Sequence, residues 1–229
     1  MKAVVIHGSH DLRLDEVAES NPGPRQVAVR VRAGGICGSD LHYYHQGGFG
    51  TVRLREPMVL GHEVAGEVIG VGRDVTALRP GDRVAVSPSL PCGACRYCLH
   101  GRPNHCLDMR FCGSAMRFPH VQGAFREVLV SEEAQVARVP AEVPLQRAAF
   151  AEPLAVCLHA ARQAGPLMGA RVLITGTGPI GALALLVARL PPDAARGGWV
   201  VARLRQERHK PTGPAPLERT PLIGSRAWR

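Results

Sequence analysis

The sequence predicts a β-rich irregular barrel or sandwich over residues 1–150, followed by the beginning of an α/β domain. Three observations lead to this prediction. The first 150 residues contain many short valine-based runs separated by glycine and proline. A helical pattern of apolar residues then begins near residue 151. Finally, a glycine-rich turn at 176–181 lies between a strand-like and a helix-like segment.

Composition places the chain among ordinary globular proteins. Its 229 residues are 45% hydrophobic and 21% charged. The sequence contains no run of 18 or more apolar residues, so it predicts no membrane span. The N-terminus resembles a strand with polar neighbours and lacks the apolar core of a signal peptide. We therefore expect a cytoplasmic protein with no membrane partner.

Four valine-based runs are the clearest candidates for strands of the first domain. In chain order they are "QVAVRVRAGG", "HEVAGEVIGVG", "DRVAVSP" and "FREVLVSE". Short strands joined by tight turns are typical of an irregular β-barrel or a sandwich.

The pattern changes after residue 150. In "AEPLAVCLHAARQAG" the apolar residues at 154, 155, 158 and 161 have helical spacing, and Gly165 is positioned to end the helix. "RVLIT" (171–175) follows as a candidate buried strand, and "PIGALALLVARL" as an apolar helix. We predict domains at 1–150 and 151–190, with 191–229 as an aberrant, disordered tail.

The turn between this strand and helix has the form G-x-G-x-x-G. On its own the motif is weak evidence, but a preceding strand and a following helix are the context that supports dinucleotide binding. Gly176 would make the tight turn, Gly178 would admit a pyrophosphate and Gly181 would let the helix pack on the preceding strand. The predicted cofactor site, for NAD or NADP, consists of Gly176, Gly178, Pro179, Ile180 and Gly181.

Four of the seven cysteines lie together in "PCGACRYCLHGRPNHC". The spacing C-x2-C-x2-C-x7-C brings four thiolates onto one loop, where they can form a closed tetrahedral shell around Zn²⁺. An iron–sulfur cluster and a set of free thiols are the alternatives. We favour a structural zinc held by Cys92, Cys95, Cys98 and Cys106.

The net charge of +9 does not indicate a nucleic-acid partner. Residues 191–229 contain eight basic and three acidic residues, and so account for +5 of it. This tail lacks aromatic interleaving and helical periodicity, which argues against a basic nucleic-acid-binding arm. We expect it to arise from a frameshift, a gene-model error or a natural truncation.

Several motifs in this order resemble the zinc-dependent medium-chain dehydrogenases. They are "GGICGSDLHYY", "PMVLGHEVAGEV", the four-cysteine loop and "GTGPIG". "AEPLAV" resembles the polyol branch of that superfamily. The stretches that most resemble its L-idonate 5-dehydrogenases are "GGICGSDLHYYHQGG", "DMRFCGSAMRFPHVQGAF" and "AEPLAVCLHAARQAG". The resemblance covers most of residues 1–190. It implies a GroES-like catalytic domain followed by an incomplete Rossmann domain.

The resemblance also implies a catalytic zinc in addition to the structural one. Cys37 and His62 match zinc ligands, and Glu63 and Glu152 match two acids at that metal, of which either could ligate directly. Zinc as a Lewis acid lowers the pKa of an alcohol, which is a poor hydride donor until it loses its proton.

A relay for the released proton is implied by the same resemblance. Ser39 and His42 match the family's relay pair, in what we expect to be a loop. Tyr43, Phe118 and His120 could line the substrate pocket or pack in the core.

The implied function is NAD(P)-linked oxidation of a secondary alcohol in a sugar acid or polyol. The substrate would be a small molecule, and a homo-oligomer is expected if the full-length domain is present. Since one strand and one helix cannot cover the faces of a doubly wound sheet, we expect little or no activity from the 229-residue chain. A non-enzymatic zinc-binding remnant is the alternative. A zinc-ribbon nucleic-acid binder is disfavoured because the flanks of the cysteine loop are not strongly basic.

Overall fold

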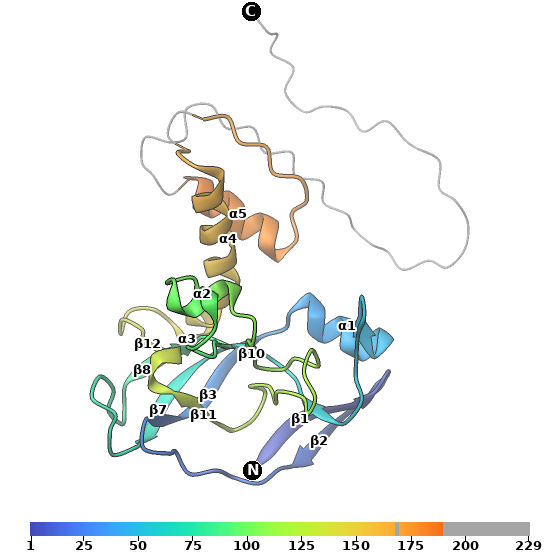
Figure 1. Ribbon diagram of the computed structural model, residues 1–229, viewed down its shortest axis with the longest axis vertical. Coiled ribbons are helices and arrows are strands. Elements are labelled where there is room, and N and C mark those ends of the chain that lie inside the picture. The colour runs from blue at the N-terminus through green and yellow to red at the C-terminus, as the bar shows by residue number, and fades with distance from the viewer. Residues whose placement is uncertain (168–169, 190–229) are drawn as a thin grey trace, which may run out of the picture.

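The computed structural model describes residues 1–167 and 170–189. Within them the strands come first and the longest helices last (Figure 1). The predicted tail from residue 191 onward lies outside the described residues.

A five-stranded antiparallel sheet forms the main core. Its order is β11-β3-β7-β8-β12, with β3 at Gln26–Gly35, β7 at Glu63–Val71, β8 at Arg83–Val86, β11 at Val128–Glu132 and β12 at Val136–Arg138. The four predicted strands are thus confirmed as β3, β7, β8 and β11. Alternate valines of these strands point inward, so Val27, Val29 and Val84 are fully buried.

A three-stranded sheet of order β2-β1-β6 lies beside it, with β1 at Lys2–Gly8, β2 at Asp11–Glu16 and β6 at Met58–Val59. The N-terminus, expected as a single strand, is therefore a hairpin. Its turn contains His10, whose φ of 61° is in the left-handed region. Two short ribbons pair β4 (Gly48–Phe49) with β5 (Val52–Arg53) and β9 (Ser89–Leu90) with β10 (Arg110–Phe111).

The helices are short within the β-rich part and longer after it. They are α1 (Gly38–Gln46), α2 (Arg96–Leu99), the 3-10 turns Pro103–His105 and Glu133–Gln135, α3 (Leu145–Ala148), α4 (Ala151–Ala164) and α5 (Pro179–Arg189). The two predicted helices are confirmed as α4 and α5. Gly165 ends α4 with a φ of 84°, as its position predicted. Figure 1 shows α4 and α5 side by side, beyond the sheets.

The predicted buried strand at 171–175 is not observed. Thr175 is the one residue of this segment that forms a β-bridge, and Leu173 is 64% exposed. A strand requires hydrogen bonds from a neighbouring strand, and no described strand lies beside this segment. Helix α5 has a similarly open face, since Val187 is its one buried residue and Leu186 is 60% exposed.

None of the helices in the described part of the chain is both long enough and apolar enough to cross a membrane.

Candidate metal and cofactor site

The pairing of β3 with β7 brings together residues that are far apart in sequence. Gly35, the last residue of β3, lies opposite Glu63, the first residue of β7. Cys37 follows two residues after Gly35, and His62 immediately precedes Glu63. The ligand atoms of Cys37, His62 and Glu63 all lie within 4.8 Å of one another. We call this group the buried cluster.

The absence of a side chain at Gly35 leaves room for the Glu63 carboxylate. A Cβ atom at Gly35 would lie 2.1 Å from Glu63 Oε2, well inside van der Waals contact. A side chain at this position would force the carboxylate out of its observed place. The sequence "GGICG" therefore positions the acid of the cluster as well as the thiol.

Asp40 supports the cluster, and sequence reasoning missed it. Its carboxylate accepts hydrogen bonds from the backbone N–H of Cys37 at 2.9 Å and of Gly61 at 3.2 Å, and its side chain is buried. Asp40 Oδ1 also lies 4.0 Å from His62 Nδ1. The signal was available: an acid at the third position of a helix that begins after Cys37 is typical of a capping box.

His62 has a buried ring nitrogen that lacks a partner. The residue is 5% exposed, and its Nδ1 has no hydrogen-bond partner among the described residues. The ring of Phe111 packs against it, with ring centroids 5.3 Å apart. A buried polar atom without a partner is costly and indicates an interaction with a further group.

The acids around the cluster favour a bound cation. Burial raises the pKa of Glu63; the His62 charge opposes this effect and the Asp40 carboxylate adds to it. Burial also raises the pKa of Glu152, opposed by His62 and reinforced by Glu63. A cation would offset the cost of placing these carboxylates together. The thiol, imidazole and carboxylate donors fit Zn²⁺.

The two acids differ in position. Glu63 belongs to the buried cluster, whereas Glu152, half-buried in the first turn of α4, lies outside the group whose ligand atoms are within 4.8 Å of one another.

Ser39 and His42 lie on helix α1, so the expectation that they occupy a loop was wrong. The helix forms because Cys37 has an extended N-cap conformation, the Asp40 carboxylate accepts a hydrogen bond from the Cys37 N–H, and Gly47 ends the helix with a φ of 64°. At a spacing of three residues, Ser39 and His42 share one helix face. Ser39 is half-buried and His42 is exposed. They therefore run from the cluster side of α1 toward solvent.

The glycine-rich turn has the geometry that its motif predicted. Gly176 has a φ of 91°. A Cβ atom at Gly181 would lie 2.0 Å from the carbonyl oxygen of Gly176, so the first turn of α5 packs directly on the loop. A Cβ atom at Gly178, by contrast, would meet no atom of the described residues within 4 Å. Pro179 and Ile180 open the helix.

A cavity of about 710 Å³ joins the buried cluster to this turn. Cys37 and Glu63 line one wall, and the glycine-rich turn lines the other. The remaining lining residues are mostly small or apolar and include Ile36, Phe150, Pro153, Ile174 and Ala184. A volume of this size suits a small ligand or part of a cofactor.

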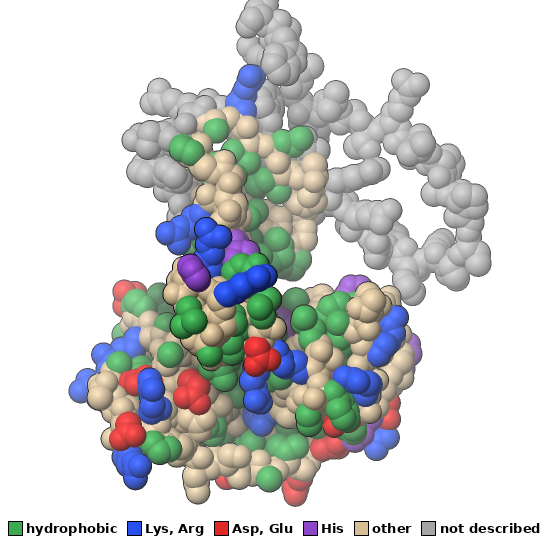
Figure 2. Space-filling model, in the orientation of Figure 1, with side chains coloured by type: hydrophobic (Ala, Val, Ile, Leu, Met, Phe, Trp, Pro, Cys, Tyr) green, Lys and Arg blue, Asp and Glu red, His purple; other side chains and the backbone are tan. Residues whose placement is uncertain are grey.

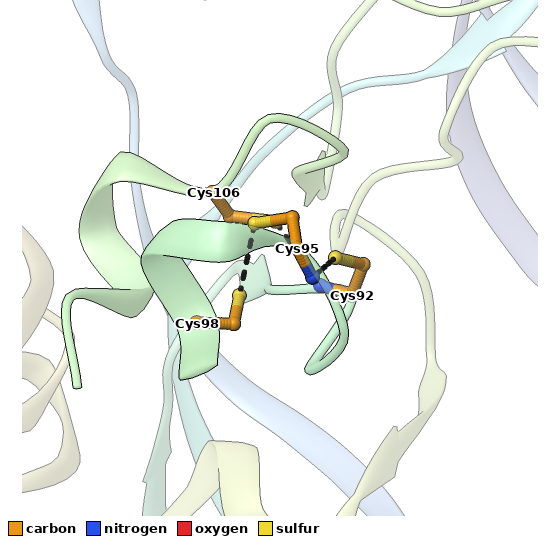
Figure 3. Close-up of side chains that lie close together, drawn as sticks. All are labelled: Cys92, Cys95, Cys98 and Cys106. Atoms are coloured by element: carbon orange, nitrogen blue, oxygen red, sulfur yellow. Dashed lines mark hydrogen bonds between the residues drawn. The ribbon is translucent and has the colours of Figure 1, made fainter. Parts of the chain in front are cut away.

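The four cysteines of residues 92–106 converge at a second site, which we call the cysteine lobe (Figure 3). Cys95 Sγ lies 3.6 Å from Cys98 Sγ and 4.0 Å from Cys106 Sγ, too far for disulfides. Sulfurs at the usual Zn–S distance of about 2.3 Å from a tetrahedral ion are about 3.8 Å apart. The observed spacing fits such an ion.

The pKa values within the lobe diverge. Backbone N–H groups, chiefly that of Cys98, lower the pKa of Cys95 to about 6. Burial and the hydrogen bond with Cys95 raise the pKa of Cys98 to about 12.

The lobe has no hydrophobic core of its own. None of residues 92–106, all of which the structure describes, is buried. Basic and histidine side chains gather over α2 in Figure 2, where Arg96, His100, Arg102 and His105 are all exposed. Gly93 and Gly101 make the predicted turns, with φ values of 73° and 69°. The lobe is therefore held by backbone hydrogen bonds, ring contacts and the converging thiols, without any buried side chain.

Two of the three residues considered for the substrate pocket, Tyr43 and His120, are buried and hydrogen-bonded to the backbone. Tyr43 is 1% exposed, and its hydroxyl accepts a hydrogen bond from the Ala115 N–H at 2.9 Å. His120 is buried; its Nε2 accepts from the Arg55 N–H at 2.9 Å and its Nδ1 donates to the Arg117 carbonyl at 2.6 Å. Both ring nitrogens are satisfied by a neutral tautomer.

Phe118 is in a different position. It is 59% exposed and lines a second cavity of about 780 Å³, outside the one that contains Cys37.

Comparison with known proteins agrees with this arrangement. Residues 23–141 match the family model described as the alcohol dehydrogenase GroES-like domain. The chain is 54% identical over 155 residues to L-idonate 5-dehydrogenase (NAD(P)(+)) of Escherichia coli K12, covering 68% of this chain and 45% of the relative. It is 39% identical over 193 residues to sorbitol dehydrogenase of Gallus gallus, covering 84% and 53%.

A solved structure shares the fold. The crystal structure of Escherichia coli K-12 L-idonate 5-dehydrogenase matches with a TM-score of 0.78 at 40% identity, covering 90% of this chain and 64% of that one. The predicted fold class is thereby confirmed. The chain spans about half the length of the curated relatives it matches. Because the domain model matches just over half of its residues, the chain belongs to the alcohol dehydrogenase GroES-like family of zinc-dependent medium-chain dehydrogenases.

Proposed function

We propose that this chain carries the metal site and the start of the cofactor site of an NAD(P)-linked dehydrogenase for sugar acids or polyols. One observation carries the proposal: a single cavity of about 710 Å³ has Cys37 and Glu63 on one wall and the glycine-rich turn on the other. Hydride transfer requires an activated alcohol and a nicotinamide to meet in one dry space.

Cys37, His62 and Glu63 would hold a catalytic zinc, and Glu152 would act on it from outside the ligand group. The unpartnered Nδ1 of His62 and the raised pKa values of both acids support this assignment. Zn²⁺ bound there would supply Lewis acidity that lowers the pKa of a substrate hydroxyl. Cys92, Cys95, Cys98 and Cys106 would hold a second, structural zinc.

The protein's own groups would then move the released proton. Ser39 on the inner part of α1 would accept it, and the exposed His42, three residues later, would pass it to solvent. The mostly apolar lining of the cavity would keep bulk water away from the reacting carbon.

The cofactor would bind with its pyrophosphate over Gly178, at the N-terminus of α5. Backbone N–H groups and the helix dipole favour an anion there. The relative named for NAD(P)(+) supports a nicotinamide cofactor and leaves both NAD and NADP as candidates.

The substrate class follows from the relatives. One is named for L-idonate and others for sorbitol, both of which carry secondary alcohols. We propose a small sugar acid or polyol as substrate, with no nucleic acid involved. A homo-oligomer of the full-length protein remains a prediction.

The test is to measure zinc per chain together with titration of NAD⁺ and NADP⁺, and turnover of L-idonate and sorbitol. We expect two zinc ions, one of which is lost in His62→Ala, and little or no turnover, because the described part of the cofactor domain is one helix and its glycine-rich turn. Saturable dinucleotide binding that is lost in Gly181→Val would show that the cofactor site is competent in this chain and would overturn the expected inactivity. Tyr44→Phe, on the far end of α1, is the matched control. A chain that binds no zinc dependent on His62 would contradict the proposal.

A zinc-binding module without enzyme activity is the second candidate. The four buried hydrophobic clusters of the described residues draw all their members from residues 3–149, and the buried cluster and the cysteine lobe lie in the same part of the chain. That part has what it needs to fold around metal by itself. Two zinc ions without any dinucleotide binding would favour this candidate.

A further inference from the structure

The cysteine lobe connects strands β9 and β10, and β10 carries Phe111, whose ring contacts His62 of the buried cluster. Strand β9 ends at Leu90, two residues before Cys92, and β10 begins at Arg110, four residues after Cys106. In the ribbon, Leu90 pairs with Arg110 and Ser89 with Phe111. Closing the lobe around an ion therefore brings the two ends of this ribbon together.

Continuous contacts run from the last cysteine to Phe111. The Asp108 N–H donates to Cys106 Sγ at 3.3 Å. Arg117 donates to the Met109 carbonyl at 2.7 Å and forms an ion pair with Asp108. The next two residues are the strand β10 itself. The segment between Cys106 and Phe111 is thus held at each step.

Phe111 is one of the groups that orient His62. Its ring packs on the imidazole with centroids 5.3 Å apart and an interplanar angle of 57°. His62 Nδ1 has no hydrogen-bond partner in the described part of the chain, and the Asp40 carboxylate is 4.0 Å away. No hydrogen bond at Nδ1 fixes the ring in the described part of the chain, so the packing of Phe111 helps to set its angle.

We propose that the metal-loaded cysteine lobe positions Phe111 on His62 and so couples metal binding at the lobe to metal binding at the buried cluster. This inference rests on the two proposed metal sites. Phe111 acts here as a positioning residue. Coupling between binding sites is reciprocal, so metal in the buried cluster must favour metal in the lobe by the same factor.

A second anchor of the ribbon provides the competing possibility. Gln135 donates from Nε2 to the Ser87 carbonyl at 3.0 Å and the Ser89 carbonyl at 3.3 Å. The Cys112 N–H donates to the Pro88 carbonyl at 3.1 Å. If these bonds alone hold Phe111 in place, the lobe has no influence on His62.

The experiment is a zinc titration of the whole metal-free chain against a chromophoric chelator. The binding event of the buried cluster is identified by its loss in His62→Ala. We expect Cys106→Ser and Phe111→Ala each to weaken that event by about tenfold or more, the usual effect of removing a group that orients a metal ligand. Phe118→Ala, an exposed aromatic on a neighbouring loop, should leave it unchanged.

The double variant Cys106→Ser/Phe111→Ala separates coupling from two independent effects. If the lobe acts through Phe111, the zinc affinity of the buried cluster in the double variant is no lower than in whichever single variant has the lower affinity. The reverse measurement keeps the lobe intact: His62→Ala should weaken zinc binding by the lobe by the same factor, with far-UV circular dichroism confirming the fold.

The outcomes distinguish failure of the coupling from failure of the proposed catalytic metal site. Unchanged cluster affinity in Cys106→Ser, or additive losses in the double variant, would overturn the coupling alone. Absence of a His62-dependent event in the unmodified chain would overturn the proposed catalytic metal site and the coupling with it.

Discussion

The cysteine lobe takes its four thiols from residues 92–106, whereas the buried cluster takes its donors from the ends of β3 and β7. The lobe buries none of its residues, so we expect its shape to depend on the ion proposed for its thiols. In the buried cluster, His62 and Glu63 are both buried and are positioned by strand pairing. With zinc bound as proposed, the metal would help to build the first site, whereas the donors of the second are already placed by the fold.

The strongest test of this contrast removes Asp40, which belongs to the fold of the buried cluster. In Asp40→Ala the N–H groups of Cys37 and Gly61 lose their buried acceptor. We expect the free energy of unfolding to fall by about 3 kcal/mol, as for loss of hydrogen bonds to a charged group. Denaturant unfolding of the metal-free chain measures this. Asp40→Asn retains an acceptor oxygen and should lose less; an equal loss would argue against the hydrogen bonds as the cause.

Gly35→Ala tests the buried cluster without removing any donor. The new methyl group would displace the Glu63 carboxylate, since a Cβ there lies 2.1 Å from Oε2. We expect zinc affinity of the cluster to fall by about tenfold, with little change in stability because a flexible side chain moves aside. Gly38→Ala is the matched control, because no described atom lies within 4 Å of its Cβ position. Equal affinities of the two variants would contradict this account.

Chelation tests the lobe. Without metal the lobe should open locally, because it lacks a core, while the five-stranded sheet stays folded. Limited trypsin digestion of the chelated sample should then give a new early cut after Arg96, which is exposed in the lobe and is followed by Tyr97. Mass spectrometry of the early fragments, compared with a zinc-saturated sample, gives the result. Early cuts in the sheet instead would mean that metal stabilises the whole domain.

The smallest expected effect is on the stability of the protein in acid, and it comes from Asp82, which belongs to neither the cysteine lobe nor the buried cluster. The Arg79 N–H and the Arg138 guanidinium lower the pKa of Asp82 below its ordinary value of 3.8. A lowered folded-state pKa stabilises the protein above the ordinary value, and this stabilisation disappears as the pH falls through the folded-state pKa.

Asp82→Asn should therefore be slightly less stable than the unmodified chain at neutral pH and indistinguishable from it at strongly acidic pH. Unfolding curves across this pH range provide the measurement, and zinc content at neutral pH should not change. A difference that persists in acid would exclude the ionised carboxylate as its source.

Sequence reasoning succeeded where the determinants are local. Valine alternation located β3 and β7, and the cysteine spacing located the lobe, because each pattern is written in consecutive residues. The buried cluster depended on a family resemblance, since strand register, and not spacing, brings Cys37 to Glu63.

The failures have physical causes as well. Asp40 was missed because its importance depends on its partners: its carboxylate accepts hydrogen bonds from the N–H groups of Cys37 and Gly61. The segment 171–175 was predicted as a buried strand from its composition, but burial depends on neighbours that composition does not describe.

Gly35 has a consequence for anyone who would transplant this site into another protein. Grafting Cys37, His62 and Glu63 onto a different pair of strands would transfer every donor atom and still misplace the carboxylate. What holds the acid in position is a space the size of one methyl group on the opposite strand. A graft has to copy that empty space along with the three side chains.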